Sequence, residues 1–371
     1  MGDRGAQKAA PAATFGDVLL SGLKHNIIRT GMDALYFSGA HMLMRPFVGG
    51  AGMILMLHHV RPARPDRFQP NRLLEITPRF LEKVCRRLKR SRLDVVSLDE
   101  MHRRLTEGNN KRRFVCVTFD DGYRDNLQFA YPILKKYEIP FGLYIPTSFP
   151  DRLGELWWLA LEAVIARNDR IGLVIDGKDQ RFDCRSVDEK RALYDSIYAW
   201  LRQLKTEEEL RQVIRDLSRR YQVDIAAFCE QLCMTWDELA TMAQDPLCTI
   251  GAHTVNHVML KKVPEKSVRT EMEMSRSVIE ASLGVRPQHF AYPVGDATSA
   301  GPREFEVARE LGFKTAVTTR PGVVFSRHRD HLMALPRISV HGEFQRMRYL
   351  RVLMSGAATA LWNGFRPVNA T

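Results

Sequence analysis

The stretch FVCVTFDDGY, residues 114–123, contains the pattern that decides the fold. Its first six residues are apolar and β-rich, which predicts a buried strand. The strand ends in two adjacent carboxylates, Asp120 and Asp121, and Gly122 then permits a sharp turn. Active sites of α/β barrels lie at the carboxyl ends of the strands, so this position favours a catalytic site. A turn that only caps a helix could carry the same residues, and the motif alone leaves that alternative open.

Similar runs before and after this stretch predict further strands. They are MILMLH (53–58), DVVSL (94–98), FGLYI (141–145), LCTIG (247–251), HFAY (289–292) and KTAVTT (314–319). Between them, apolar residues at helical spacing predict helices, among them one that begins at Pro78 behind the N-cap Thr77 and others over 98–107, 126–137 and 263–283. This alternation predicts an α/β fold with a parallel sheet, open or closed into a barrel.

The stretch 150–246 breaks the alternation. It combines a helix containing Trp157 and Trp158, a hairpin around Asp176-Gly177 and further helical segments, which predicts a largely helical insertion. The terminal helices, over roughly 17–46 and 343–362, either dock on the barrel or lie flat on a membrane surface. The expected organisation is an N-terminal helical extension (1–50), a main domain (51–342) that contains the insertion, and a C-terminal amphipathic helix and tail (343–371).

The composition is that of an ordinary globular protein that can bury its own core. Of the 371 residues, 45% are hydrophobic and 26% are charged. The net charge of +12 favours an anionic partner such as membrane lipid or a phosphate-bearing sugar carrier. The alternative is that the basic residues simply lie on solvated helix faces. The sequence contains no nucleic-acid-binding motif, so we expect no nucleic-acid partner.

The six cysteines are scattered along the chain, which favours buried thiols over a disulfide framework. That usage fits a reducing compartment. Residues 1–16 are small and polar, and no apolar signal-peptide core follows a basic start. We therefore expect a cytoplasmic protein, with peripheral membrane contact through the basic terminal helices as the alternative.

A second motif, HTVNH, follows the predicted strand LCTIG. The i, i+4 spacing of His253 and His257 predicts two imidazoles on one face of a helical turn, a common way to supply two ligands to a divalent metal. A polar loop is the alternative for two histidines taken alone. Together with an aspartate at another strand end, the two histidines leave coordination positions open, as a catalytic metal requires. The second aspartate can then serve as a general base.

Three motifs together resemble a known family. TFDDGY, HTVNH and FAYPVG, in that order over roughly residues 52–340, resemble the signature motifs of NodB-type polysaccharide deacetylases. The resemblance implies a distorted (β/α) barrel that removes an acetyl group from an N-acetylated amino sugar in a poly- or oligosaccharide. It implies Asp120 as the general base, and the ligands of a zinc or similar divalent ion as Asp121, His253 and His257. In the third motif it implies substrate contacts by Tyr292 and Val294, the latter through a backbone N–H that binds the oxyanion.

The third motif departs from the family pattern in two places. Gln288 stands where the family usually has an arginine, and Val294 stands where many members have an aromatic residue. The family's late leucine-x-histidine motif, the source of its general acid, is not evident either.

Two other sequence elements could supply the missing histidine and the missing arginine. MLHHV is similar to the N-terminal tyrosine-histidine motif of biofilm poly-N-acetylglucosamine deacetylases, whose motif order is circularly permuted, and this implies His58 as the catalytic acid. Leu335-Pro336-Arg337 resembles a late element that would place Arg337 beside Asp120. His59 points to the opposite face of a strand, so both histidines cannot be catalytic. A core histidine is the alternative reading of His58, and His341 is the reserve candidate for the acid.

Two further functions stay open. The basic terminal helices favour a deacylase of a lipid-linked amino sugar at the membrane surface. The departures in the third motif leave room for a non-catalytic sugar-binding module of the same fold. The intact pair of aspartates and pair of histidines argues against the module, because binding alone requires neither a base nor metal ligands.

Overall fold

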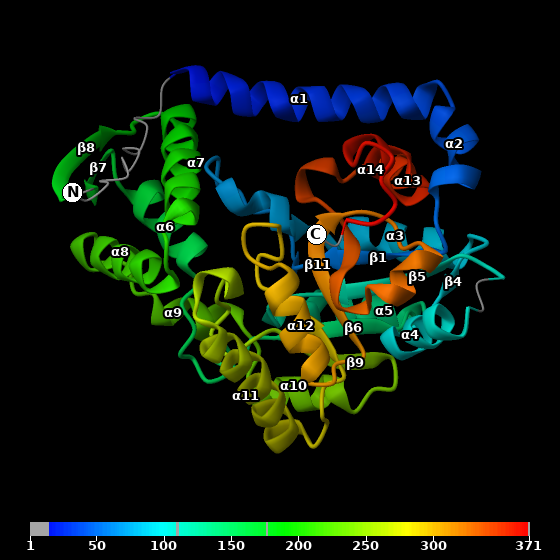
Figure 1. Ribbon diagram of the computed structural model, residues 1–371. Coiled ribbons are helices and arrows are strands. Elements are labelled where there is room, and N and C mark those ends of the chain that lie inside the picture. The colour runs from blue at the N-terminus through cyan, green and yellow to red at the C-terminus, as the bar shows by residue number, and fades with distance from the viewer. Residues whose placement is uncertain (1–14, 109–110, 176, 370–371) are drawn as a thin grey trace, which may run out of the picture. The chain divides into compact units, whose positions relative to one another are not determined.

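Seven parallel strands close into a barrel in the computed structural model, which describes residues 15–108, 111–175 and 177–369. In order around the barrel they are β1 (Gly52–Leu57), β12 (Leu335–Ser339), β11 (Thr315–Pro321), β10 (His289–Ala291), β9 (Cys248–Ala252), β6 (Phe141–Ile145) and β5 (Phe114–Phe119). Pairing of β1 with β5 closes the ring, and the short β4 (Asp94–Val95) lies outside on β5. The predicted distorted (β/α) barrel is confirmed (Figure 1).

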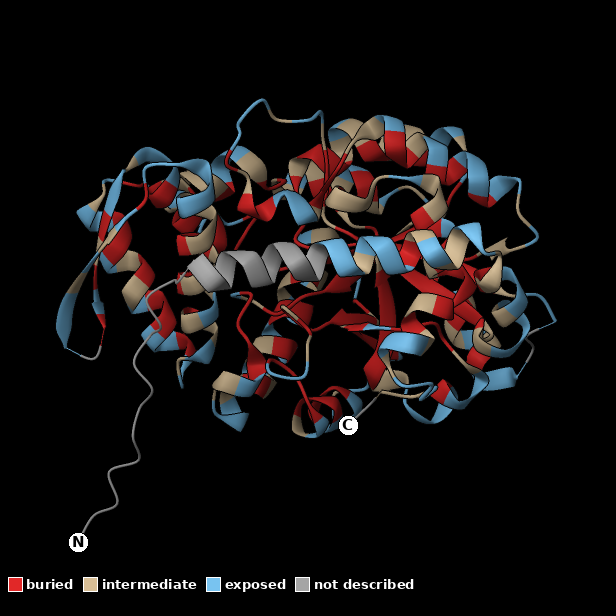
Figure 2. Cartoon of the chain, turned by 90° about the horizontal axis from the view of Figure 1, so that it is seen from above, coloured by how far each residue is buried: buried red, intermediate tan, exposed pale blue. Residues whose placement is uncertain are grey.

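Helices surround the barrel, and those predicted behind Thr77 and over 98–107, 126–137 and 263–283 form close to the predicted positions. The surrounding helices include α3 (Pro78–Lys89), α4 (Leu98–Glu107), α5 (Tyr131–Lys136) behind the π-turn η2 (Asn126–Ala130), α9 (Ala226–Leu232), α10 (Trp236–Ala243), α11 (Glu265–Leu283) and α12 (Pro302–Glu310). The Thr77 side chain accepts the Phe80 N–H and Pro78 occupies the first turn of α3, as predicted. Figure 2 shows the barrel strands almost entirely buried and the outer helices buried mainly on one face.

One compact unit comprises residues 65–71 and 156–225 together with residues 15–29. It contains α6 (Trp157–Arg167), α7 (Val187–Gln203) and α8 (Glu207–Arg220). Its strands β7 (Arg170–Ile175) and β8 (Lys178–Asp183) pair antiparallel, which confirms the predicted hairpin. Within the unit, Asn71 donates to the Trp158 carbonyl at 3.1 Å and to Glu162 at 2.8 Å. The remaining residues form the barrel unit, which also includes the short paired strands β2 (His59–Val60) and β3 (Glu75–Ile76).

The terminal helices differ from the prediction, because each is broken at a glycine. The N-terminal segment forms α1 (Phe15–Phe37) and α2 (Ala40–Val48), separated at Gly39 with φ 73°. The C-terminal segment forms α13 (Met347–Ser355) and α14 (Ala357–Trp362), separated at Gly356 with φ 83°. A Cβ at Gly356 would lie 2.2 Å from the Val48 carbonyl oxygen, so only glycine permits this close packing.

These breaks let the two ends of the barrel unit pack on each other. Helix α2 packs against α13 and α14, and Arg348 pairs with Asp33 at 2.6 Å. Among the residues that the structure describes, no helix is both long and apolar enough to span a bilayer.

Candidate active site

Three potential metal ligands meet at the carboxyl ends of β5 and β9. The Oδ1 atom of Asp121 lies 3.5 Å from Nε2 of His253 and 3.3 Å from Nε2 of His257. All three side chains are buried, and their candidate ligand atoms lie within 4.8 Å of one another. The residue types predicted from the sequence thus meet at the ends of two strands that flank β6.

The spacing of these atoms fits a divalent ion. Two ligands of a tetrahedral zinc with bonds of 2.0–2.1 Å are about 3.3–3.4 Å apart. Within the described chain, Asp121 Oδ1 makes no hydrogen bond of ordinary geometry. A buried carboxylate oxygen without a hydrogen bond is destabilising unless a cation binds to it. The His253 Nδ1–H donates to the Ala291 carbonyl at 2.6 Å, which leaves the Nε2 lone pair facing Asp121. Although burial acts to raise it, the two histidines hold the pKa of Asp121 well below its usual range.

The prediction that HTVNH forms a helical turn is wrong. Thr254 and His257 have φ values of 66° and 54°, in the left-handed region, which an α-helix excludes. The Thr254 hydroxyl accepts the His257 N–H at 2.9 Å, and Glu271 of α11 accepts the N–H groups of Val255 and Asn256 at 2.8 and 2.9 Å. An irregular turn held by Glu271 thus brings the two imidazoles together.

Asp120 is held by Arg337. The guanidinium donates from Nη1 to Oδ1 at 2.7 Å and from Nη2 to Oδ2 at 2.6 Å, and its Nε–H donates to the Thr318 carbonyl at 2.9 Å. Both side chains are buried. Burial acts to raise the pKa of Asp120, but the charge and hydrogen bonds of Arg337, together with the charges of His253 and His58, lower it overall. Arg337 therefore lies beside Asp120, where the late leucine-proline-arginine element predicted it.

We expect the substitution Arg337→Met to destabilise the protein by about 3–5 kcal/mol, because it leaves the buried Asp120 charge unpaired. Urea unfolding measures this loss. In an Asp120→Asn background the same substitution should cost much less, since no charge is then stranded. An equal cost in both backgrounds would mean that Arg337 acts through packing and not through the ion pair.

The two adjacent histidines point in opposite directions, as a strand requires. His58 lies just beyond β1 with its Nε2 3.9 Å from Asp120 Oδ2, too long for a hydrogen bond. Burial lowers the pKa of His58, and the charges of Asp120 and Asp121 act in the opposite direction. His59 is buried on the other side, where its Nδ1 lies 2.6 Å from Asp125 Oδ2 and its ring stacks on Tyr123 at 3.5 Å. His58, and not His59, faces the site.

Comparisons with known proteins find polysaccharide deacetylases. A family model described as polysaccharide deacetylase matches residues 193–316, a range that contains HTVNH and FAYPVG. The Bacillus subtilis (strain 168) protein YxkH, whose name also describes a polysaccharide deacetylase, is 24% identical over 227 residues. Over part of its length, the chain is therefore similar to polysaccharide deacetylases. The aligned region covers 61% of this chain but only 51% of YxkH, so the chain spans about half the length of that relative.

Solved structures share the fold of this chain. The deacetylase PplD of Streptococcus pyogenes, in complex with acetate, superposes with a TM-score of 0.54 at 20% identity, covering 81% of this chain and 97% of PplD. A de-N-acetylase from Aggregatibacter actinomycetemcomitans gives a TM-score of 0.51 at 15% identity, covering 81% and 99% of the two chains. At these identities the likeness shows the fold alone.

The predictions for the third motif, FAYPVG, give a mixed result. The Tyr292 side chain is fully buried and its hydroxyl donates to the Met333 carbonyl at 2.9 Å, so this side chain belongs to the core and does not face a substrate. Val294 is partly exposed with φ 61°, a strained value for a β-branched residue. Four of the eight non-glycine residues with positive φ in the described chain belong to the three motifs, namely Asp121, Thr254, His257 and Val294. Strain of this kind concentrates at functional sites.

The other predicted positions lie outside this cluster. The Gln288 amide donates to the Arg286 carbonyl at 3.2 Å, on an exposed part of the barrel. Nδ1 of His341 accepts the Glu343 N–H at 3.3 Å and so caps a short turn.

The sequence analysis did not identify two residues, Asp125 and Glu271, whose hydrogen bonds hold the backbone in or beside the motifs. Asp125 holds His59 and accepts the Val60 N–H at 3.0 Å, which ties the end of β1 to the TFDDGY turn. Its position directly after the motif could have marked it. Glu271 holds the HTVNH turn, but α11 contains several glutamates and no local pattern distinguishes this one.

Proposed function

We propose that the chain is a metal-dependent hydrolase that removes the acetyl group from an N-acetylated amino sugar in a poly- or oligosaccharide. The observation that carries the proposal is the placement of Asp120, held by Arg337, next to the buried group of Asp121, His253 and His257. Similarity to the polysaccharide deacetylase family model supports the reaction, and the name of YxkH points to the same class of substrate. The six free cysteines, five of them buried, support a reducing compartment.

Asp121, His253 and His257 would hold the ion, and one carboxylate with two imidazoles suits zinc. When bound, such an ion polarises the amide carbonyl and makes water more acidic. Arg337 fixes the orientation of Asp120 and keeps it ionised, so that Asp120 can accept a proton from the attacking water. The Val294 N–H is the candidate donor to the oxygen that becomes negatively charged.

His58 completes the reaction by giving a proton to the departing nitrogen. The C–N bond breaks as that proton arrives, and the products are acetate and a free amine on the sugar. A screen of N-acetylated oligosaccharides, with readout of released acetate and of the position of the free amine, tests the proposal and identifies the glycan. Absence of acetate release from every N-acetylated sugar by the ion-loaded protein would reject it.

Replacement of His58 should affect turnover and leave ion content unchanged. We expect His58→Ala to lower amide turnover by about 10²–10⁴-fold, because general acid catalysis contributes that much to expulsion of a poor leaving group. An activated ester with a good leaving group should lose far less. His59→Ala is the matched control, and we expect it to lower the unfolding midpoint while ester turnover per folded molecule stays the same. Wild-type amide turnover in His58→Ala together with loss of activity in His341→Ala would instead assign the acid to His341.

A further inference from the structure

Helix α2 carries its apolar side chains on the outside. Met42, Leu43 and Phe47 are 69%, 76% and 84% exposed, whereas His41 on the inner face is 6% exposed. A helix on the surface of a globular domain normally shows the reverse arrangement. The outward face of α2 is therefore suited to contact with an apolar partner.

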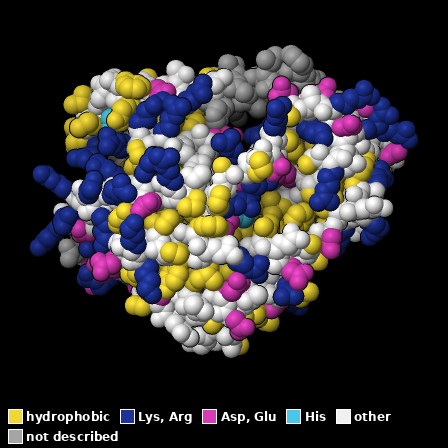
Figure 3. All heavy atoms as spheres, turned by 180° about the vertical axis from the view of Figure 1, so that it is seen from behind, with side chains coloured by type: hydrophobic (Ala, Val, Ile, Leu, Met, Phe, Trp, Pro, Cys, Tyr) yellow, Lys and Arg dark blue, Asp and Glu magenta, His cyan; other side chains and the backbone are white. Residues whose placement is uncertain are grey.

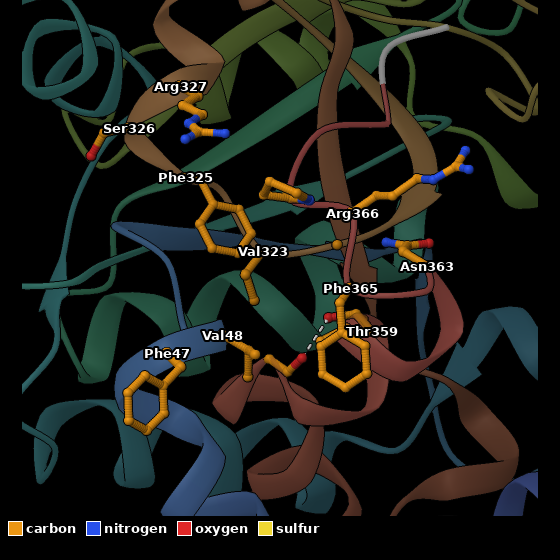
Figure 4. A pocket seen from close by; sticks show the side chains of 14 residues that line it. Phe47, Val48, Val323, Phe325, Ser326, Arg327, Thr359, Asn363, Phe365 and Arg366 are labelled. Atoms are coloured by element: carbon orange, nitrogen blue, oxygen red, sulfur yellow. Dashed lines mark hydrogen bonds between the residues drawn. The ribbon is translucent and has the colours of Figure 1, made fainter.

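The C-terminal segment extends this face. Leu361, Trp362 and Phe365 are 50%, 64% and 60% exposed, and α14 packs against α2. Phe47 and Phe365 line one pocket of about 440 Å³, which Figure 4 shows with Phe325 contributed by a third segment. We call the set formed by Met42, Leu43, Phe47, Leu361, Trp362 and Phe365 the terminal surface.

The charged side chains on α2 and in the lining of the pocket are all arginines. Arg45 lies on α2, and Arg327 and Arg366 line the pocket (Figure 4). Neither residues 34–50 nor residues 344–371 contain an Asp or Glu. Seen from behind in Figure 3, the side of the molecule that carries α2 shows hydrophobic and basic side chains next to one another. The combination of exposed aromatic and aliphatic groups with arginines is complementary to anionic lipid.

We propose that the terminal surface binds the surface of an anionic lipid bilayer. Its apolar side chains would enter the boundary between head groups and acyl chains, while the arginines pair with lipid phosphates. A second copy of the chain is a poorer occupant, because a two-fold interface would place these arginines against their own counterparts. The inference does not depend on the proposed hydrolase function. Helix α2 leads into the amino end of β1, whereas the candidate active site lies at the carboxyl ends of the strands, so binding leaves the site accessible.

Trp362 provides a direct reporter. It is the exposed member of the five tryptophans, since the other four are buried or half-buried. Full-length protein is mixed with phosphatidylcholine vesicles with or without phosphatidylglycerol, and binding is measured by flotation and by tryptophan emission. We expect a blue shift and co-flotation with the anionic vesicles, weakened by salt. Trp362→Phe should remove the shift and keep most of the binding.

The substitutions separate the apolar and the ionic contributions. Phe47→Ser and Phe365→Ser should each weaken binding roughly tenfold, and Arg45→Gln and Arg366→Gln roughly fivefold each. Met274→Ser and Arg309→Gln, exposed positions on α11 and α12, are the matched controls and should have no effect. Three results would overturn the proposal: no binding to anionic vesicles, equal binding to neutral vesicles, or a dimer in solution that Phe47→Ser dissociates.

Discussion

Asp120→Asn should retain the bound ion and lose about 10²–10⁴-fold of amide turnover, while Asp121→Asn should lose both ion and turnover. The two carboxylates are adjacent in sequence but have different partners. Asp120 is held by the Arg337 guanidinium, whereas Asp121 faces the two imidazoles. An amide at Asp120 preserves the shape of the side chain and removes the basic oxygen. Metal analysis after gel filtration and acetate release measure the two properties separately.

Asp125→Asn is the matched control for this pair, because it changes a neighbouring buried carboxylate that contacts His59 and not the ligand group. We expect it to retain both the ion and turnover. If Asp120→Asn emptied the site and Asp121→Asn did not, the assigned roles would be exchanged.

His253→Ala and His257→Ala should each weaken ion binding by more than about 100-fold. Loss of a residue that only hydrogen-bonds to a metal ligand typically weakens binding by about 10–100-fold, and loss of a ligand itself should cost more. Each histidine supplies one of the three ligand atoms that meet at Asp121. Turnover should fall in parallel with occupancy and should return in part at high zinc concentration. Metal titration followed by calorimetry measures the affinities.

His289→Ala controls for the removal of a buried imidazole. His289 is fully buried at the amino end of β10 and contacts Thr315 at 2.8 Å, away from the ligand group. Its loss should lower stability and leave ion affinity unchanged. Full ion occupancy in the His253→Ala/His257→Ala double variant would show that the ion binds elsewhere.

The barrel was predictable because its strands are buried on both faces and therefore appear as continuous apolar runs. FVCVTF and FGLYI became β5 and β6 with little change in boundaries. The strand β12 was not predicted as a strand, since it contains Pro336 and the charged Arg337. Arg337 is tolerated there because Asp120, more than two hundred residues earlier, neutralises it.

The site was predictable in composition but not in backbone conformation. The i, i+4 spacing of His253 and His257 is shared by a helical turn and by the irregular turn that the chain adopts. The choice between them depends on Glu271 of α11, a contact that local sequence does not encode. The burial of Tyr292 was not predictable for the same reason. Its hydroxyl donates to the Met333 carbonyl, which belongs to a segment distant in the sequence. By contrast, the helix breaks at Gly39 and Gly356 had a local signal in the glycines themselves.

Metal-dependent deacetylation is best tested by acetate release from an N-acetylated oligosaccharide while ion-stripped protein is titrated with zinc. We expect background release without the ion, a rise that levels off at about one ion per chain, and no rise in the His253→Ala/His257→Ala double variant. Full acetate release by the stripped protein, or the same titration curve in the double variant, would show that the reaction does not use an ion bound by these histidines.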